Sequence, residues 1–478
     1  MTAKMHMAIS HLVLALLVLV LAGSAQAQAA PAGDVPRFEP APCPLPAPAG
    51  VACGYLVVWE DRAEPAGGTI RLPIAILPSD DPDPEPDPVV YLTGGPGSTA
   101  IAGVNAWRGH PARAHRDLIL LEQRGTRYAE PALACPEVHD VLRGNMTLAL
   151  SGEEEVAREV AAAAACRDRL LAEGVDLSAY NSAASAADVA ELRQVLGYEQ
   201  INLLGVSYGT RLALTILRDY PEGIRSVVLN SAFPVDVDTY IELVPNAQAA
   251  FHALFADCEA DPACRAAYPD VEETFYRVLE AANRDPIAVD IPTPPYHVLL
   301  TAKDIIAGMF QSLGQLDRNA IVPFLVDQMD KRNVDALVPM VENGVPGLFG
   351  FSRGMMQSVE CYEEAPFNPW EEIVAAAWVR PVLLDYLPIH FNLAICDVWP
   401  SGQAGPIEDE PVHSDVPVLL LAGAYDPYTP PSWSAHAVET LSNGYVFVFP
   451  GLGHGPLGYS RCAREIAAAF WADPDTPP

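Results

Sequence analysis

A serine between two glycines, in the segment Gly205-Val206-Ser207-Tyr208-Gly209, constrains the fold of this chain more than any other feature. The segment lies between an apolar run at 201–204 and a helix-like run at 210–220. In a sharp turn from a strand into a helix the backbone at the serine is strained. Side chains two residues away on either side would clash as the strand and helix close together. The pattern therefore predicts a strand–turn–helix unit with Ser207 exposed at its apex.

Runs rich in Val, Ile and Leu predict an α/β fold around this turn. Such near-continuous runs are typical of strands buried on both faces of a parallel sheet. Helical patterns lie between them, including 153–171 and 186–196, and Ser185 is a candidate cap for the second. This alternation predicts a mostly parallel, doubly wound sheet. The predicted strands are 54–59, 69–77, 89–92, 118–121, 201–204, 226–229, 416–421 and 445–449.

Residues 1–27 have the pattern of a signal peptide. Lys4 supplies positive charge, residues 12–22 form an apolar run, and Ala25-Gln26-Ala27 offers a small-x-small cleavage site. The apolar run is short for a membrane span, and no other stretch is long enough. We therefore expect an exported protein, periplasmic or extracellular, with no stable membrane insertion once the signal is removed.

The mature chain divides into a core and an insertion. Residues 28–235 are expected to form the first part of the core, beginning with an extended Pro- and Ala-rich arm at 31–50. Residues 236–400 break the strand–helix alternation and predict an inserted, mainly helical cap. Residues 401–478 return to the alternating pattern and predict the C-terminal part of the core.

Charge and cysteine content narrow the range of partners. The chain has 61 Asp and Glu against 28 Lys and Arg, a net charge of -33, which repels nucleic acid and anionic lipid. Cysteines in an exported chain indicate disulfides. No Cys-x-x-Cys or His-Glu-x-x-His occurs, so no metal site is predicted. Proximity along the chain suggests the pairs Cys43–Cys53, Cys135–Cys166, Cys258–Cys264 and Cys361–Cys396, with Cys462 left alone.

A serine hydroxyl needs a base within hydrogen-bond reach, and the base needs an orienting acid. In folds with this turn the acid and then the histidine follow the serine along the chain. His454 lies in a Gly-rich loop just past the last predicted strand, whereas His436 lies in a helix-like run. Asp426 follows the preceding strand, with Asp397 as the alternative acid. These positions predict a Ser207–His454–Asp426 triad.

Acyl transfer also needs two N–H donors for the developing oxyanion. The backbone N–H of Tyr208, directly after the nucleophile, is one candidate. The other lies in Thr93-Gly94-Gly95-Pro96-Gly97, the loop after a predicted strand. Pro96 has no N–H, so Gly95 is the favoured donor and Gly94 the next.

Together these residues resemble the exported proline iminopeptidase and tripeptidyl aminopeptidase branch of the α/β-hydrolases, over about residues 43–475. The resemblance implies an α/β-hydrolase fold with a helical cap, and a secreted serine exopeptidase with a TAP-like C-terminal part. Two positions depart from the family pattern, Thr93 in place of His and Glu122 in place of Asp. The segments that carry the resemblance are Cys53-Gly54-Tyr55-Leu56, Gly94-Gly95-Pro96-Gly97, Gln123-Arg124-Gly125-Thr126, Gly205-Val206-Ser207-Tyr208-Gly209-Thr210, Cys361-Tyr362-Glu363-Glu364, Asp426-Pro427-Tyr428-Thr429-Pro430 and Gly453-His454-Gly455.

The resemblance also implies a site for the substrate amine. Glu363 and Glu364 match the acidic pair that follows the cap cysteine in the family, and carboxylates hold an ammonium group by charge-assisted hydrogen bonds. Of the two, Glu363 is the favoured anchor.

Three functions remain open at this point. The leading one is a serine aminopeptidase that releases N-terminal residues or short peptides through an acyl-enzyme, without metal or organic cofactor. A carboxylesterase would use the same triad on a small ester substrate. A non-catalytic binding protein on a hydrolase fold is the third, and the complete triad argues against it.

Overall fold

Nine strands form one mixed sheet in the computed structural model, which describes residues 35–292, 295–313, 319–378, 380–386 and 392–478. The predicted signal peptide lies outside these residues. The sheet order is β1-β2-β3-β5-β4-β6-β7-β10-β11. The strands are β1 (Arg37–Pro40), β2 (Ala52–Trp59), β3 (Thr69–Leu77), β4 (Val89–Leu92), β5 (Leu118–Leu121), β6 (Ile201–Val206), β7 (Ile224–Asn230), β10 (Val418–Gly423) and β11 (Gly444–Phe449).

The strand directions divide the sheet into two parts. β1, β2, β3 and β5 pair antiparallel with their neighbours along one side of the sheet. From β5 through β4, β6, β7, β10 and β11 every pairing is parallel. Parallel strands end at the same edge, so the loops after β4, β6, β10 and β11 meet there. This edge brings together the residues predicted for the triad and the oxyanion site.

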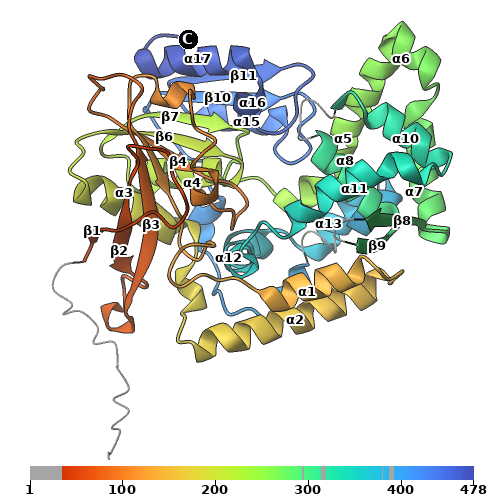
Figure 1. The fold of residues 1–478 in the computed structure, drawn as a ribbon, viewed down its shortest axis with the longest axis horizontal. Helices are drawn as coiled ribbons and strands as arrows, with labels where there is room; N and C mark the ends of the chain where they lie inside the picture. Colours follow the sequence, from red (N-terminus) through yellow and green to blue (C-terminus); the bar gives the residue numbers. More distant parts are fainter. Residues whose placement is uncertain (1–34, 293–294, 314–318, 379, 387–391) are drawn as a thin grey trace, which may run out of the picture. The chain divides into compact units, whose positions relative to one another are not determined.

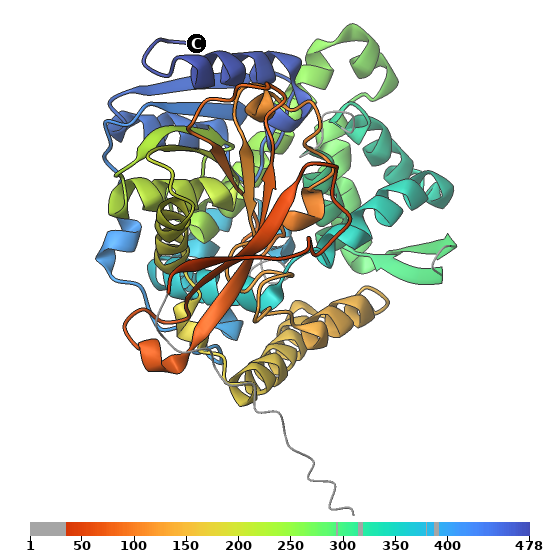
Figure 2. The same ribbon diagram turned by 60° about the vertical axis from the view of Figure 1, so that its left-hand side comes forward.

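Helices cover both faces of the sheet, as a doubly wound fold requires (Figures 1 and 2). On one face the buried side chains pack against α3 (Ser182–Val195), α4 (Tyr208–Asp219) and α15 (Pro431–Ala437). On the other face they pack against α16 (Pro456–Tyr459) and α17 (Arg461–Ala472). Neighbours such as Leu203 and Leu204 on β6 belong to opposite clusters because side chains alternate along a strand.

The eight predicted strands are all present, with ends within a few residues of those expected. One strand was not predicted, and one local prediction is wrong. The N-terminal arm contains strand β1, which pairs with β2 through Phe38 opposite Leu56. Helix α3 is capped by Asn181, not by Ser185: the Asn181 side chain accepts a hydrogen bond from Ala184 N, while Ser185 lies inside the helix and is buried.

The segment between β7 and β10 forms a largely helical layer with its own apolar core (Figures 1 and 2). It also contains a two-stranded antiparallel hairpin, β8 (Ile287–Pro292) and β9 (Pro295–Leu300), which the sequence analysis did not predict. We call this segment the cap. Its helices are α5 (Thr239–Ala260), α6 (Pro262–Ala267), α7 (Val271–Arg284), α8 (Ala302–Leu313), α10 (Val322–Asp330), α11 (Val334–Leu348), α12 (Arg353–Val359) and α13 (Trp370–Ala377).

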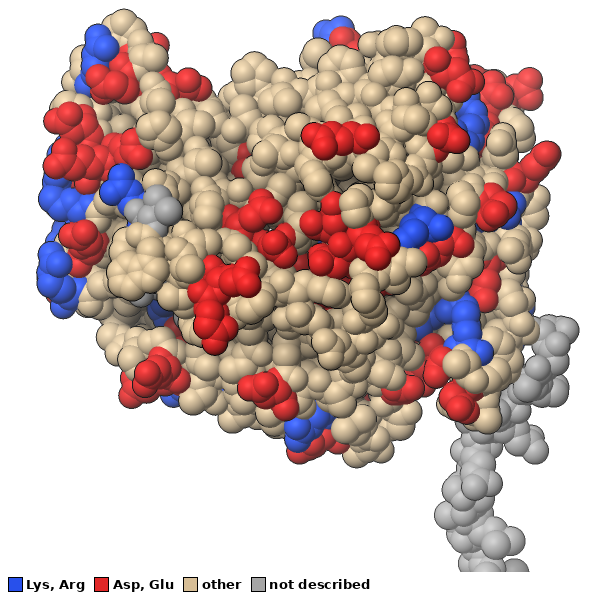
Figure 3. Space-filling view, turned by 180° about the vertical axis from the view of Figure 1, so that it is seen from behind, with Lys and Arg blue, Asp and Glu red and all other residues tan. Residues whose placement is uncertain are grey.

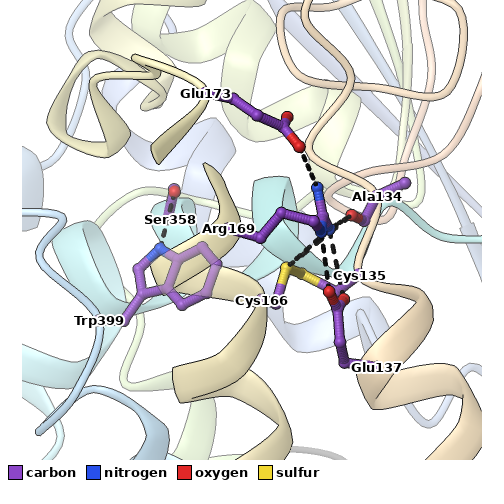
Figure 4. Close-up of a disulfide and its surroundings, with 8 residues drawn as sticks. All are labelled: Ala134, Cys135, Glu137, Cys166, Arg169, Glu173, Ser358 and Trp399. Atoms are coloured by element: carbon purple, nitrogen blue, oxygen red, sulfur yellow. Dashed lines mark hydrogen bonds and ion pairs between the residues drawn. A yellow bond between two sulfur atoms is a disulfide. The ribbon is translucent and has the colours of Figure 1, made fainter. Parts of the chain in front are cut away.

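All four predicted cysteine pairs are disulfide-bonded, and Cys462 is free and exposed. Figure 4 shows the bond that joins Cys135, at the start of α1 (Pro136–Asn145), to Cys166 of α2 (Gly152–Ala172). Beside it Arg169 forms an ion pair with Glu137 at 2.8 Å. The fourth disulfide, Cys361–Cys396, holds the segment that carries Glu363 and Glu364.

The surface is predominantly acidic, as the amino-acid composition predicts. On the face shown in Figure 3, acidic side chains outnumber basic ones and extend in an irregular band across the molecule. In the described part of the chain, every helix is too short or too polar to cross a bilayer.

Candidate active site

Ser207 occupies the strained turn that its flanking glycines predict. Strand β6 ends at Val206 and α4 begins at Tyr208, which leaves Ser207 between them with φ 56° and ψ -127°. A Cβ atom on Gly205 would lie 2.5 Å from the Gly209 carbonyl oxygen, and one on Gly209 would lie 2.0 Å from that of Leu92. Both glycines are therefore required by close backbone approach.

The predicted acid and base are hydrogen-bonded to each other. His454 Nδ1 lies 2.8 Å from Asp426 Oδ2, although the two residues are 28 positions apart. Asp426 is 1% exposed and lies in the loop after β10, whereas the His454 side chain is 20% exposed and lies after β11. The alternatives lie elsewhere: His436 pairs with Asp236 at 2.6 Å, and Asp397 is exposed.

Two hydroxyl groups that the sequence analysis did not identify complete the surroundings of Asp426. Its Oδ2 accepts hydrogen bonds from Ser231 Oγ at 2.8 Å and from Thr429 Oγ1 at 2.7 Å. Its Oδ1 accepts from the backbone N–H groups of Tyr428 and Thr429, each at 3.0 Å. Burial favours the neutral acid, but His454 and these donors outweigh it and hold the pKa of Asp426 below its ordinary value.

The end of β7 ties Ser207 to the loop of His454. Ser207 N donates to the Asn230 carbonyl at 3.2 Å, and Gly455 N donates to Ser231 Oγ at 2.8 Å. Consecutive residues of β7 and its following turn therefore fix both loops. Among the described residues, neither Ser207 Oγ nor His454 Nε2 has a hydrogen-bond partner, so both are available to a substrate.

The glycine loop after β4 passes directly over Ser207. A Cβ atom on Gly94 would lie 2.9 Å from Ser207 Cβ. Gly95 has φ 119°, a conformation that favours glycine. Buried Glu122, which replaces the family's Asp, holds the next turn by accepting hydrogen bonds from the N–H groups of Ala100 and Ile101, each at 3.0 Å. These bonds anchor the segment that follows the glycine loop.

A cavity of about 80 Å³ opens beside Ser207. Its wall contains Ser207, Gly95 and Tyr208 from the sheet edge. Aromatic rings form much of the remainder, and two of them, Phe233 and Trp433, stack with centroids 5.4 Å apart. The other lining residues are Pro96, Arg211, Thr239, Tyr240, Leu243, Val359, Glu360, Glu364, Tyr428 and Thr429.

The acidic part of this wall comes from a π-helical turn in the cap, Glu360–Glu364. A π-helix has a wider turn than an α-helix, and such turns are frequent at functional sites. Glu360 and Glu364 line the cavity, whereas Glu363 does not. Glu363 is 1% exposed, accepts a hydrogen bond from Ser182 N, and lies 3.3 Å from Arg211 Nε. Glu360 could not be predicted as a lining residue from the sequence, because the matched family motif begins at Cys361.

Arg211 lies one helical turn after Ser207 and supplies positive charge to this group. Its Nη1 atom is 2.7 Å from Glu364 Oε1, without the alignment that a hydrogen bond requires, so Oε1 lacks a donor. Burial raises the pKa of Glu363 to about 7, against the opposing effect of Arg211. Burial also raises the pKa of Glu360 to about 8, and Glu364 adds to that rise while Arg353 opposes it. Burial therefore outweighs the effect of the nearby arginines and favours the neutral form of Glu360 and Glu363.

The nucleophile turn, the hydrogen-bonded acid and histidine, and the parallel sheet beneath them define a class of enzyme fold. Residues 87–458 match the family described as alpha/beta hydrolase fold, and the chain belongs to that family. This confirms the predicted fold class.

Relatives within the family include named peptidases. The serine protease Hip1 of Mycobacterium tuberculosis is 23% identical over 463 residues, which cover 90% of this chain and 87% of that protein. The tripeptidyl aminopeptidase of Streptomyces lividans is 24% identical over 420 residues, 81% of this chain and 74% of that protein. A proline iminopeptidase of Lactobacillus delbrueckii subsp. bulgaricus is 44% identical over 55 residues, 11% of this chain and 19% of that protein. These matches confirm the resemblance seen in the sequence.

Proposed function

We propose that this protein is an exported serine aminopeptidase. Ser207 attacks the carbonyl carbon of the N-terminal acyl group while His454 Nε2 accepts the hydroxyl proton. Asp426 holds the histidine through Nδ1 and stabilises its charged form. His454 then protonates the leaving amine. A water molecule attacks the acyl-enzyme carbonyl while His454 accepts its proton, the bond to Ser207 Oγ breaks, and His454 returns the proton to Ser207 as the acid leaves.

The oxyanion of the tetrahedral intermediate is held by the backbone N–H groups of Gly95 and Tyr208 in this proposal. Tyr208 is the first residue of α4, so its N–H is one of the donors that a helix leaves without an internal partner. The mechanism uses only side chains and backbone groups of the chain.

One observation favours an aminopeptidase over an esterase: Glu360 and Glu364 line the same cavity as Ser207. An ammonium group that enters this cavity meets two carboxyl groups. Oε1 of Glu364 forms an ion pair with Arg211 but accepts no hydrogen bond from the described residues, so it can still accept one from the ammonium group. A neutral ester gains nothing from buried carboxyl groups, which only cost desolvation. In this proposal Glu363 is a positioning residue that holds Arg211 and the π-helical turn.

The test compares a leucine anilide with a free amine, its N-acetylated counterpart, and a small neutral ester. We expect the free-amine anilide to be cleaved at least 100-fold faster, by kcat/KM, than the acetylated one. Glu364→Gln should lower kcat/KM for the free-amine anilide about 10- to 100-fold, the range for losing a charged hydrogen bond, and spare the ester.

Glu371→Gln is the matched control because it removes one negative charge from an exposed position on α13. It should leave all three substrates unchanged. Equal loss on the ester and the free-amine anilide in Glu364→Gln would contradict the amine-binding role. Faster cleavage of the ester and the acetylated anilide than of the free-amine anilide would favour the esterase.

A further inference from the structure

The glycine loop after β4 is bonded to the core at one end and to the cap at the other. The Thr93 carbonyl accepts a hydrogen bond from the core residue Gln123, through Nε2, at 2.9 Å. The Gly97 carbonyl accepts one from Ser352 N at 2.8 Å, and Ser352 immediately precedes α12 of the cap. Gly95, the proposed oxyanion donor, lies between these two bonds. The cap therefore holds one end of the loop that passes over the nucleophile.

Close packing connects this cap contact to Gly95. A Cβ atom on Gly97 would lie 2.7 Å from the Ser352 carbonyl oxygen, and the φ of Gly97 is 92°. A Cβ atom on Gly95 would in turn lie 2.8 Å from Gly97 N. Atoms packed this closely leave no free space between the two glycines. A displacement of Gly97 therefore also displaces Gly95.

The cap side of the contact is firmly anchored. Ser352 is 3% exposed, and Gly354 N donates to the Leu133 carbonyl of the core at 2.8 Å. Met355 is fully buried and packs in the same apolar cluster as Leu133. Helix α12 then continues directly into the π-helical turn that lines the cavity. One segment, 352–364, thus touches the glycine loop at its beginning and carries the cavity carboxyl groups at its end.

We propose that Ser352 is a positioning residue for the oxyanion site. Its N–H holds the glycine loop so that the Gly95 N–H points at the oxyanion, and the cap thereby contributes to kcat as well as to substrate choice. A preorganised donor stabilises the transition state only at the correct distance, so a small shift of the loop is costly. The inference rests on the proposed function, because it takes Ser207 as the nucleophile and Gly95 as an oxyanion donor.

Ser352→Pro removes this hydrogen bond, because proline has no N–H and the φ of Ser352, -76°, lies within its range. We expect kcat to fall about 10- to 100-fold for leucine anilide and for a small neutral ester, since both form the same oxyanion, with KM and the thermal unfolding temperature retained. Ser352→Ala keeps the N–H and is the conservative variant, so it should retain kcat. An unaltered kcat in Ser352→Pro, or an equal loss in Ser352→Ala, overturns the inference.

Gly97→Ala disturbs the same contact from the loop and serves if Ser352→Pro does not fold. Its Cβ atom would meet the Ser352 carbonyl, so the loop must move and kcat should fall at least about tenfold with KM retained. Gly109→Ala is the matched control: Gly109 also has a positive φ, 67°, but a Cβ atom there would meet open space. This control should retain kcat. Equal losses of kcat in the two glycine variants overturn the inference.

The ester separates this inference from the proposed aminopeptidase. If the unaltered protein hydrolyses the ester and not the free-amine anilide, the aminopeptidase is wrong, while a loss of kcat on the ester in Ser352→Pro still supports the positioning role. If both substrates are cleaved and Ser352→Pro raises KM alone, the aminopeptidase stands and the inference is overturned. Hydrolysis of neither substrate overturns both.

Discussion

The sheet edge and the acidic turn of the cap face the same cavity, but different kinds of interaction hold them. At the edge, Ser207, Asp426 and His454 each follow a strand, and backbone geometry fixes their positions. In the cap, Glu360, Glu363 and Glu364 come from one π-helical turn whose place depends on Arg211, Ser182 and a disulfide.

The difference separates chemistry from selectivity. Residues at the ends of parallel strands meet wherever the sheet forms, so the group to which we assign the chemistry depends little on the rest of the chain. The acidic turn is held by buried charges and long-range bonds, so substitutions there should change both substrate choice and stability.

The largest expected effect is at the edge. Ser207→Ala should lower kcat/KM about 10⁵-fold or more, because it removes the only nucleophile in the proposed mechanism. Alanine accepts the same backbone conformation as readily as serine, so the thermal unfolding temperature should stay within a few degrees. Activity within tenfold of the unaltered enzyme would show that the edge does not carry the chemistry.

Asp426→Asn should lower kcat about 10⁴-fold, since an amide in place of the carboxylate favours the wrong tautomer of His454. The variant also loses an acceptor for Ser231 and Thr429, which unfolding by urea would detect. Asp397→Asn, at the exposed alternative, should have no effect on kcat.

In the cap the larger effect should be on stability. The pKa of Glu360 is about 8 in the folded protein against 4.5 for the free side chain, so the folded state retains a proton that the unfolded state releases. Stability therefore falls as pH rises from 5 to 8. Glu360→Gln removes this titration. The free energy of unfolding of the variant should therefore exceed that of the unaltered protein by more at pH 8 than at pH 5, with a difference on the order of 3 kcal/mol.

Urea unfolding at the two pH values measures this difference, with Glu371→Gln as the control. If the free energy of unfolding of Glu360→Gln depends on pH as steeply as that of the unaltered protein, Glu360 ionises in the folded protein as it does in the unfolded chain. The variant should also bind free-amine substrates less well, which would separate selectivity from stability at one position.

The smallest effect should come from Thr429, whose hydroxyl bridges the acid and the base. Thr429→Val removes its hydrogen bond to Asp426 and its 3.1 Å contact with His454 Nδ1, and should lower kcat about 10-fold. Thr440→Val, which loses a hydroxyl that donates to the Val412 carbonyl away from the cavity, should leave kcat unchanged. A loss confined to KM would contradict a role beside the triad.

The same contrast explains what could be predicted from sequence. Local sequence patterns determine strand β6, its turn and the loop of His454. Ser207, Asp426 and His454 could therefore be predicted from the sequence alone. The lining position of Glu360 could not, because it depends on a π-helical turn and on charges from α4 and α12. Strand β1 was overlooked for a related reason: its pairing with β2 is not visible in its own short sequence.

Reaction with a fluorophosphonate probe tests the central claim, that Ser207 and His454 act as one unit, most directly. We expect a phosphonyl adduct on the tryptic peptide that contains Ser207, formed at least 10³-fold more slowly in His454→Gln and at the unaltered rate in His436→Gln. An adduct on another residue, or an unaltered rate in His454→Gln, would contradict the account.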